Sequence, residues 1–410
     1  MTAHHRPRTR LRALTAVACT AALGAALLTG ATPAASASAS ASASTSARAE
    51  DPPGRKVVGT YTNWGVYGRD SHIKDLRTSG AAERLTHIRY FHGRVEERGC
   101  FPGDAYADFD RHYGAAQSVD GTADTWDQPV WGNVNQLRKL KKLHPRLKVV
   151  WSFTDWSRLG DLGESPAEAR RFARSCRALV EDPRWGDVFD GIDIDWQYPH
   201  PGDESFRTLM SAMRAEFGGD LVTATVSGDA APGGTIDAID YAEAADDVDW
   251  FNLMTYRLYG RHETRGPTAP HAPLRAYPGI PHRYATVDAA IRKLKDHDVP
   301  AGKLLLGVSF EGHGWTGVTR STPGGTATGP AQGTEQPAVD LYRALKTRCP
   351  ATGRAGGTAY AHCGAEWWSY DTPDTIADKV AYGKRQRLGG TFLWELSGDT
   401  PGGELIKAVR

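Results

Sequence analysis

Two carboxylates and an amide stand at alternate positions in residues 190–199, which read DGIDIDWQYP. Residues two apart in an extended strand face the same side, so Asp193, Asp195 and Gln197 project together while the apolar residues between them face away. Positioned acids of this kind suit general acid–base work on a polar bond. Gln197 is close in shape to glutamate and can donate a hydrogen bond, but it cannot release a proton. The segment therefore predicts a pocket that recognises a polar substrate with two acids and one amide.

Short β-rich runs alternate with helical patterns along the chain, in the order that a parallel α/β barrel requires. Chemistry in such barrels lies where strands end and loops begin, and Gln197 comes just after one of these runs. Helical patterns lie at 134–143, 166–180 and 203–216. The expected strands are 57–61, 87–90, 148–153, 191–195, 221–226, 250–254, 304–310 and 390–394.

The motif resembles the D-G-x-D-x-D-x-E signature of glycoside hydrolase family 18 chitinases, with Gln197 in place of the catalytic Glu. The resemblance runs from GTYTNWGVYGRD at Gly59 to GGTFLWELSGD ending at Asp399, and it is strongest to secreted actinobacterial members. It implies an α/β fold, a (β/α)8 TIM barrel with a small α+β insertion at about 314–372 between strands seven and eight. It also implies cleavage of β-1,4 links between N-acetylglucosamine units, with the substrate's acetamido oxygen as nucleophile.

The resemblance assigns roles to the polar residues of this pocket. Asp195 is expected to orient and stabilise the cyclised acetamido group with support from Asp193, and Tyr256 in MTYR to hydrogen-bond that group. Trp394 is the expected stacking platform for the central sugar. No metal or cofactor is implied. The implied substrate-binding residues are Trp64, Tyr198, Met254, Arg257, Glu311 and Trp394.

Several positions of the pattern depart from the family. Where the family has S-x-G-G, this chain has Thr154 and Asp155 in place of the two glycines. Where the family has MTYD, this chain has Arg257 in place of the aspartate. The family's second strand is usually similar to HINYAFGNV, and residues 87–95 of this chain read HIRYFHGRV. Glu311 stands in the seventh strand where the family usually has Tyr. We expect Arg257 to pair with Glu311 or with Asp155, and the pocket floor to be narrowed. Clustered substitutions of this kind indicate natural divergence.

Three functions are compatible with these residues. The favoured one is binding of chitin or N-acetylglucosamine oligosaccharides with little or no hydrolysis. A second is an active chitinase or related endo-β-N-acetylglucosaminidase in which Glu311 or Asp155 supplies the proton. A third is a protein-interaction module on an inactive barrel. Retained Asp195, Tyr256 and Trp394 favour sugar over protein.

The aromatic residues Trp126 and Trp131 have two interpretations. Flat rings with polar edges suit pyranose rings, so both could line sugar subsites. They could equally pack on the barrel rim, and the sequence does not distinguish the two.

The N-terminus predicts export. Arginines and then an apolar run from Ala13 to Ala31 precede an Ala/Ser-rich stretch, so we expect residues 1–48 to be a cleaved signal peptide and linker. This region holds five of the 49 basic and none of the 48 acidic residues, which leaves a formal charge of about −4 on residues 49–410. We therefore expect a secreted monomeric barrel that binds a glycan, with neither nucleic acid nor membrane as partner.

Four cysteines follow the predicted leader: Cys100, Cys176, Cys349 and Cys363. An even number in an exported chain indicates two disulfides, and four cysteines allow three pairings. Buried free thiols are the alternative. The resemblance and the short intervening loop favour Cys349 with Cys363, which leaves Cys100 with Cys176.

Overall fold

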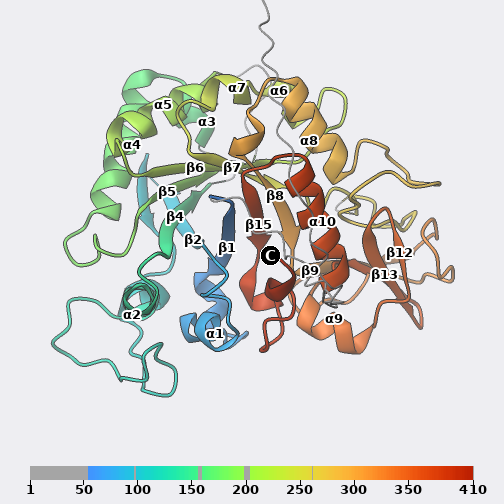
Figure 1. Cartoon of the computed structure of the whole chain (residues 1–410), viewed down its shortest axis with the longest axis horizontal. Helices are drawn as coiled ribbons and strands as arrows, with labels where there is room; N and C mark the ends of the chain where they lie inside the picture. Colours follow the sequence, from blue (N-terminus) through green and yellow to red (C-terminus); the bar gives the residue numbers. More distant parts are fainter. Residues whose placement is uncertain (1–53, 97, 156–158, 198–203, 261, 410) are drawn as a thin grey trace, which may run out of the picture. The chain divides into compact units, whose positions relative to one another are not determined.

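The computed structural model describes residues 54–409 apart from 97, 156–158, 198–203 and 261. The predicted leader at 1–48 and the predicted binding residue Tyr198 lie outside this part of the chain. Eight parallel strands form a closed ring in the order β1-β15-β8-β7-β6-β5-β4-β2, because β1 pairs with β2 as well as with β15 (Figure 1). The predicted (β/α)8 barrel is confirmed.

The barrel strands coincide closely with the runs expected from sequence. β5, β7 and β15 have the predicted bounds, and β1, β4, β6 and β8 differ by one residue at one or both ends. β2 continues six residues further than expected. The strands are β1 (Lys56–Thr62), β2 (His87–Glu96), β4 (Lys148–Thr154), β5 (Gly191–Asp195), β6 (Leu221–Ser227), β7 (Trp250–Met254), β8 (Leu304–Ser309) and β15 (Gly390–Trp394).

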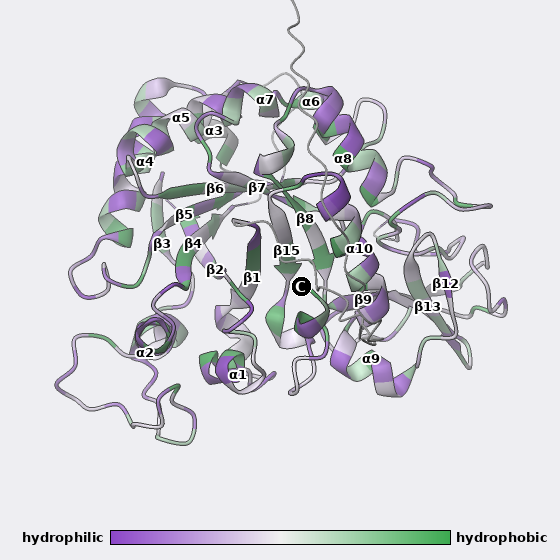
Figure 2. Ribbon diagram, in the orientation of Figure 1, coloured by the Kyte–Doolittle hydropathy of each residue, from purple (hydrophilic) through white to green (hydrophobic). Residues whose placement is uncertain are grey.

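Amphipathic helices cover the outside of the ring. In α4 (Pro166–Val180), the Ser165 hydroxyl accepts a hydrogen bond from the backbone N–H of Glu168, and proline follows at the first helical position. The helix buries Ala169, Phe172, Ala173, Cys176 and Val180, a spacing that makes one apolar stripe. Figure 2 shows hydrophilic and hydrophobic segments alternating along α4 and α8. The other helices are α1 (Ile73–Thr78), α2 (Gly132–Leu143), α3 (Leu159–Gly163), α5 (Ser205–Phe217), α6 (Thr235–Ala238), α7 (Tyr241–Ala244), α8 (Val287–Asp296) and α10 (Pro373–Arg385).

A second, antiparallel sheet lies between β8 and β15, where an insertion was predicted. It begins at Glu311 rather than near residue 314, and it carries helix α9 (Tyr342–Arg348). Its aromatic residues form a small core of their own, in which Trp315 and Trp367 are buried. The strands are β9 (Glu311–Thr316), β10 (Gly329–Pro330), β11 (Val339–Leu341), β12 (Gly353–Ala355), β13 (Thr358–Cys363) and β14 (Glu366–Tyr370).

Two disulfides cross-link the chain, one between residues 76 positions apart and one between residues 14 positions apart. Cys100 in β3 (Gly99–Pro102), a short strand antiparallel to β2, bonds to Cys176 of α4. Cys349 after α9 bonds to Cys363 at the end of β13. These are the predicted pairings, and each restricts the unfolded chain, which typically stabilises a fold by about 2–4 kcal/mol. Within the described residues, no helix has the length and apolarity needed to span a membrane.

Candidate functional site

Asp193 lies inside the barrel and holds four neighbouring strands together. Its side chain is fully buried and accepts hydrogen bonds from Ser152 Oγ at 2.7 Å, Thr223 Oγ1 at 2.6 Å and Asn252 Nδ2 at 3.0 Å. These donors belong to β4, β6 and β7. A buried charge is tolerated only when it is well paired, and this one is.

A buried arginine completes that pairing. Arg89 of β2 has no exposed surface, and its Nε donates to Asp193 Oδ2 at 2.7 Å. Its Nη2 lies 2.5 Å from Asp195 Oδ2. Burial lowers the pKa of Arg89, but the two carboxylates outweigh burial and raise it above the ordinary value. One cation therefore forms ion pairs with both acids of the β5 motif.

The amide of Gln197 donates a hydrogen bond to the oxygen of Asp195 that Arg89 does not bind. Gln197 Nε2 donates to Asp195 Oδ1 at 2.9 Å, while Arg89 holds Oδ2. Thr154, which replaces a glycine of the family pattern, donates its hydroxyl to the backbone carbonyl of Asp195 at 3.0 Å. Burial raises the pKa of Asp195, and the neighbouring Arg89 and Gln197 oppose that rise. Both carboxylate oxygens of this residue are thus engaged within the protein.

A second ion pair spans the ends of β7 and β9. Arg257 Nη2 lies 2.5 Å from Glu311 Oε2, and the indole N–H of Trp394 donates to the same oxygen at 3.1 Å. The predicted pairing of Arg257 with Glu311 is confirmed. The backbone of Arg257 has φ 53°, a left-handed conformation that non-glycine residues adopt at a cost of order 1–3 kcal/mol and that surrounding contacts must hold.

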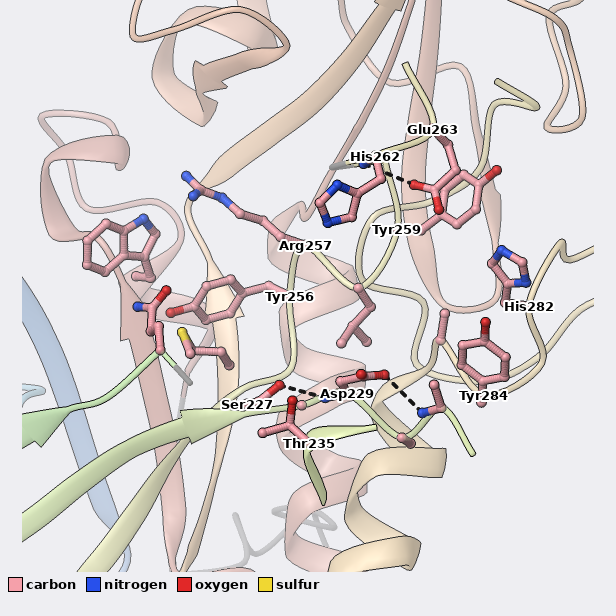
Figure 3. Close-up of a pocket in the computed structure, with 18 of the residues that line it drawn as sticks. Ser227, Asp229, Thr235, Tyr256, Arg257, Tyr259, His262, Glu263, His282 and Tyr284 are labelled. Atoms are coloured by element: carbon pink, nitrogen blue, oxygen red, sulfur yellow. Dashed lines mark hydrogen bonds between the residues drawn. The ribbon is translucent and has the colours of Figure 1, made fainter. Parts of the chain in front are cut away.

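A pocket of about 430 Å³ opens at the carboxyl ends of β5, β6 and β7, and Trp394 of β15 also lines it. Figure 3 shows its labelled residues, from Tyr256 to Tyr284. Tyr256 is buried in its wall, and burial holds the pKa of the phenol well above the ordinary value, so the hydroxyl stays a hydrogen-bond donor. The predicted residues that line the pocket are Asp195, Gln197, Met254, Tyr256, Arg257 and Trp394.

Three other predicted residues lie outside this lining. Asp193 sits beneath the pocket in the barrel, and Glu311 is buried behind Arg257. Trp64 packs edge-on against Phe91 and His92, with ring centres 5.6 Å apart in both pairs. The structure describes no cluster of side chains suited to hold a metal ion among residues 54–409 outside the gaps.

Trp126 and Trp131 form a separate aromatic group with His112. Trp126 is 82% exposed, and its ring centre lies 3.8 Å from that of His112. His112 also stacks on Trp131 at 4.7 Å. Neither tryptophan lines the pocket.

Sequence reasoning missed two groups of residues. The first is the single residue Arg89. A signal was present, because an arginine at an inward position of a buried strand requires an acidic partner, and the acids of β5 were available. The second lines the outer part of the pocket from the loops after β6 and β7, where no motif marks them. The main members are Asp229, Tyr259, His262, Glu263, His282 and Tyr284.

Comparison with known proteins agrees with this architecture. Residues 56–399 match the model of a family described as Glycosyl hydrolases family 18. The chain belongs to this family. It is 54% identical over 368 residues to Chitinase 63 of Streptomyces plicatus, a match that covers 87% of this chain and 60% of that protein. The family 18 chain thus spans about three fifths of that relative's length.

Solved structures share the fold of this family 18 chain. The catalytic domain of psychrophilic chitinase B from Arthrobacter TAD20 superimposes with a TM-score of 0.80 at 32% identity, covering 87% of this chain and 94% of that one. YKL-39, solved in the presence of chitooligosaccharides (GlcNAc4), gives a TM-score of 0.71 at 21% identity, covering 86% of this chain and 98% of that one. The latter likeness bears on the fold alone.

Proposed function

We propose that this family 18 protein is exported and binds chitin or N-acetylglucosamine oligosaccharides in the pocket, with little or no hydrolysis. The observation that carries the proposal is the state of Asp195, whose two oxygens accept from Arg89 and from the amide of Gln197. An acid position filled by an amide and a stabilising carboxylate bound to a buried cation together oppose the reaction.

The amide removes the proton that the reaction needs. By resemblance, the residue at position 197 protonates the departing sugar oxygen, and an amide has no proton to give at neutral pH. Loss of a positioned acid typically slows a reaction by about 10²–10⁴-fold.

Arg89 acts on the other half of the reaction. The cyclised acetamido group carries positive charge, which a carboxylate at position 195 would stabilise. Here that carboxylate already pairs with a guanidinium that has no exposed surface. A new positive charge above Asp195 would gain less from it than from an acid without a cationic partner.

Binding makes different demands, and the pocket meets them. Trp394 offers a ring, Tyr256 a hydroxyl that remains protonated, and Met254 an apolar wall. Apolar and aromatic walls with a few placed polar groups are typical of ligand sites. The name of the Streptomyces plicatus relative, a chitinase, supports a chitin-type ligand.

A relocated acid is the competing proposal, and the geometry favours it less. Glu311 is 4% exposed, and one of its oxygens accepts from both Arg257 and Trp394. Asp155 is not among the residues that line the pocket. Glu311 is held in an ion pair and neither carboxylate lines the pocket, which counts against both as the proton donor.

Titration calorimetry with chitin hexasaccharide tests the proposal when the ligand is recovered and weighed by mass spectrometry. We expect saturable heat and an intact hexasaccharide. Absence of binding, or recovery of shorter products at the rate of an active chitinase assayed alongside, contradicts it.

A further inference from the structure

We propose that the pocket takes the end of a saccharide chain, or a short free oligosaccharide, because a cluster centred on Phe91 closes the groove on the other side of Trp394. This inference rests on the proposed function and specifies its ligand. The family's usual polymer would run past Trp394 in both directions. Here one direction is filled by the protein's own side chains.

The lining of the pocket is one-sided. Apart from Trp394, every lining residue in the described part of the chain belongs to β5, β6 or β7 or to the segments after them, within 195–197, 227–235, 254–259, 262–263 and 282–285. No lining residue in the described part of the chain comes from β1, β2, β4 or the second sheet. In Figure 3, Tyr256 lies near one end of the pocket and His282 and Tyr284 at the other.

The opposite side of Trp394 is packed with rings. Phe91, at the end of β2, is 7% exposed and meets Trp394 edge-on with ring centres 5.3 Å apart. Trp64 contacts Phe91 from the segment after β1, and the Arg89 guanidinium lies 4.6 Å from the centre of the Phe91 ring. Phe91 stands where the family pattern HINYAFGNV has alanine, so a phenyl ring occupies space that a methyl group would leave open.

An ionic bridge spans the same side. Arg69, after β1, pairs with Glu335 of the insertion and with Glu395, the residue directly after Trp394. Arg343 of α9 donates to the backbone carbonyl of Arg69 at 3.4 Å. The bridge ties together three segments that border this side: the β1 loop, the end of β15 and the second sheet. The bridge holds these segments in place beside Phe91, and a saccharide leaving Trp394 in this direction would have to displace that ring.

The pocket size agrees with a short ligand. Its volume of about 430 Å³ lies toward the lower end of the roughly 300–1,000 Å³ that is usual for small-molecule sites. We therefore expect affinity to stop rising once a few sugars fill it.

A length series with the unaltered protein tests the inference. Calorimetry with the chitin di-, tri-, tetra- and hexasaccharides should give affinities that level off by the trisaccharide, with the hexasaccharide within about twofold of it. A hexasaccharide that binds tenfold more tightly than the trisaccharide overturns the inference and leaves the proposed function intact. Absence of binding at every length overturns the proposed function itself.

Replacement of Phe91 gives the converse experiment. Phe91→Ala should open the closed side and make the hexasaccharide bind at least fivefold more tightly than the trisaccharide. Phe101→Ala is the matched control, since Phe101 in β3 is 37% exposed and lies outside the pocket. If Phe91→Ala does not fold, Glu335→Gln weakens the partly exposed arm of the bridge and should shift the affinity ratio in the same direction. A folded Phe91→Ala protein with an unchanged length profile contradicts the inference.

Discussion

Trp394 has an open pocket on one side and packed side chains on the other. The polar groups of the first side border the pocket, and those of the second side bind other protein groups. Toward β5, β6 and β7, side chains such as Tyr256 and Glu263 border an open pocket. Toward β1 and β2, the charged groups of Arg89 and Arg69 bind other protein groups, and Phe91 packs among them. On our proposal the first side binds sugar, while the second is filled by contacts within the protein.

The contrast separates recognition from catalysis. Recognition needs rings and hydrogen-bond donors, which survive on the open side. Catalysis needs a proton donor and a carboxylate able to meet new positive charge, and the proposed function holds that Gln197 and Arg89 impair both. On this proposal a family 18 barrel loses the reaction through a few side chains and keeps its pocket.

The largest expected effect is a loss of folding stability when Arg89 is removed. Arg89→Ala leaves Asp193 and Asp195 buried beside each other, and loss of one partner of a buried ion pair typically costs about 3–5 kcal/mol of folding free energy. Chemical denaturation measures this. Arg94→Ala is the matched control on the same strand, because Arg94 and its partner Glu96 are exposed and such pairs contribute at most about 1 kcal/mol. Equal losses in the two variants would contradict a stabilising role for Arg89.

Restoring the acid at position 197 separates the effect of Gln197 on catalysis from the effect of Arg89. Gln197→Glu alone should give only slow cleavage of chitin hexasaccharide, because Arg89 still holds Asp195. The double change Arg89→Asn and Gln197→Glu should raise the rate by on the order of 10²-fold over the single change, the size of one electrostatic contribution to a transition state. Product formation by mass spectrometry measures both rates, after circular dichroism shows that both variants fold. Full chitinase turnover by Gln197→Glu alone would show that Arg89 does not hinder the reaction.

The open side should depend on its aromatic platform. Trp394→Ala should weaken hexasaccharide binding by roughly 2 kcal/mol, the usual size of a central anchor, or about 30-fold in Kd. Trp126→Ala removes the same kind of side chain from an 82% exposed position outside the pocket and should leave the affinity unchanged. Equal weakening in both variants would place the sugar elsewhere.

A gradual effect is expected from pH, through the buried carboxyl group of Asp108. Asp108 is buried and accepts hydrogen bonds from Tyr90 and Asn63, and burial raises its pKa to about 7 from an ordinary 3.8. The folded protein thus holds this proton more tightly than the unfolded chain, so stability falls as pH rises from about 4 to about 7, by up to about 1.4 kcal/mol per pH unit.

Asp108→Asn removes that titration. The stability of the wild type relative to this variant should therefore decrease by roughly 1 kcal/mol per unit between pH 5 and pH 7 and become constant above pH 8. Urea denaturation at four pH values measures the difference. A constant difference across the range would show that Asp108 titrates normally.

The fold was largely predictable because its signals are local. A buried strand such as β5 and a capped helix such as α4 are each specified by neighbouring residues, and all eight barrel strands fall on runs expected from sequence. The pairing of Arg257 with Glu311 was also predictable, because the two residues closely follow the adjacent strands β7 and β8. Arg89 was not recognised, since its acidic partners lie more than 100 positions away in sequence. The outer pocket residues come from loops, whose paths depend on contacts that no short pattern records.

The central claim is that this site binds sugar without cutting it, and one time course tests it most directly. Purified protein is incubated with chitin hexasaccharide at concentrations that saturate the site, and products are followed by mass spectrometry beside an active chitinase and a heat-inactivated sample. We predict that the hexasaccharide remains intact, as in the inactivated sample, while calorimetry on the same preparation shows it bound. Steady release of shorter oligosaccharides by the wild-type protein alone would contradict the claim and would make Glu311 and Asp155 the next residues to replace.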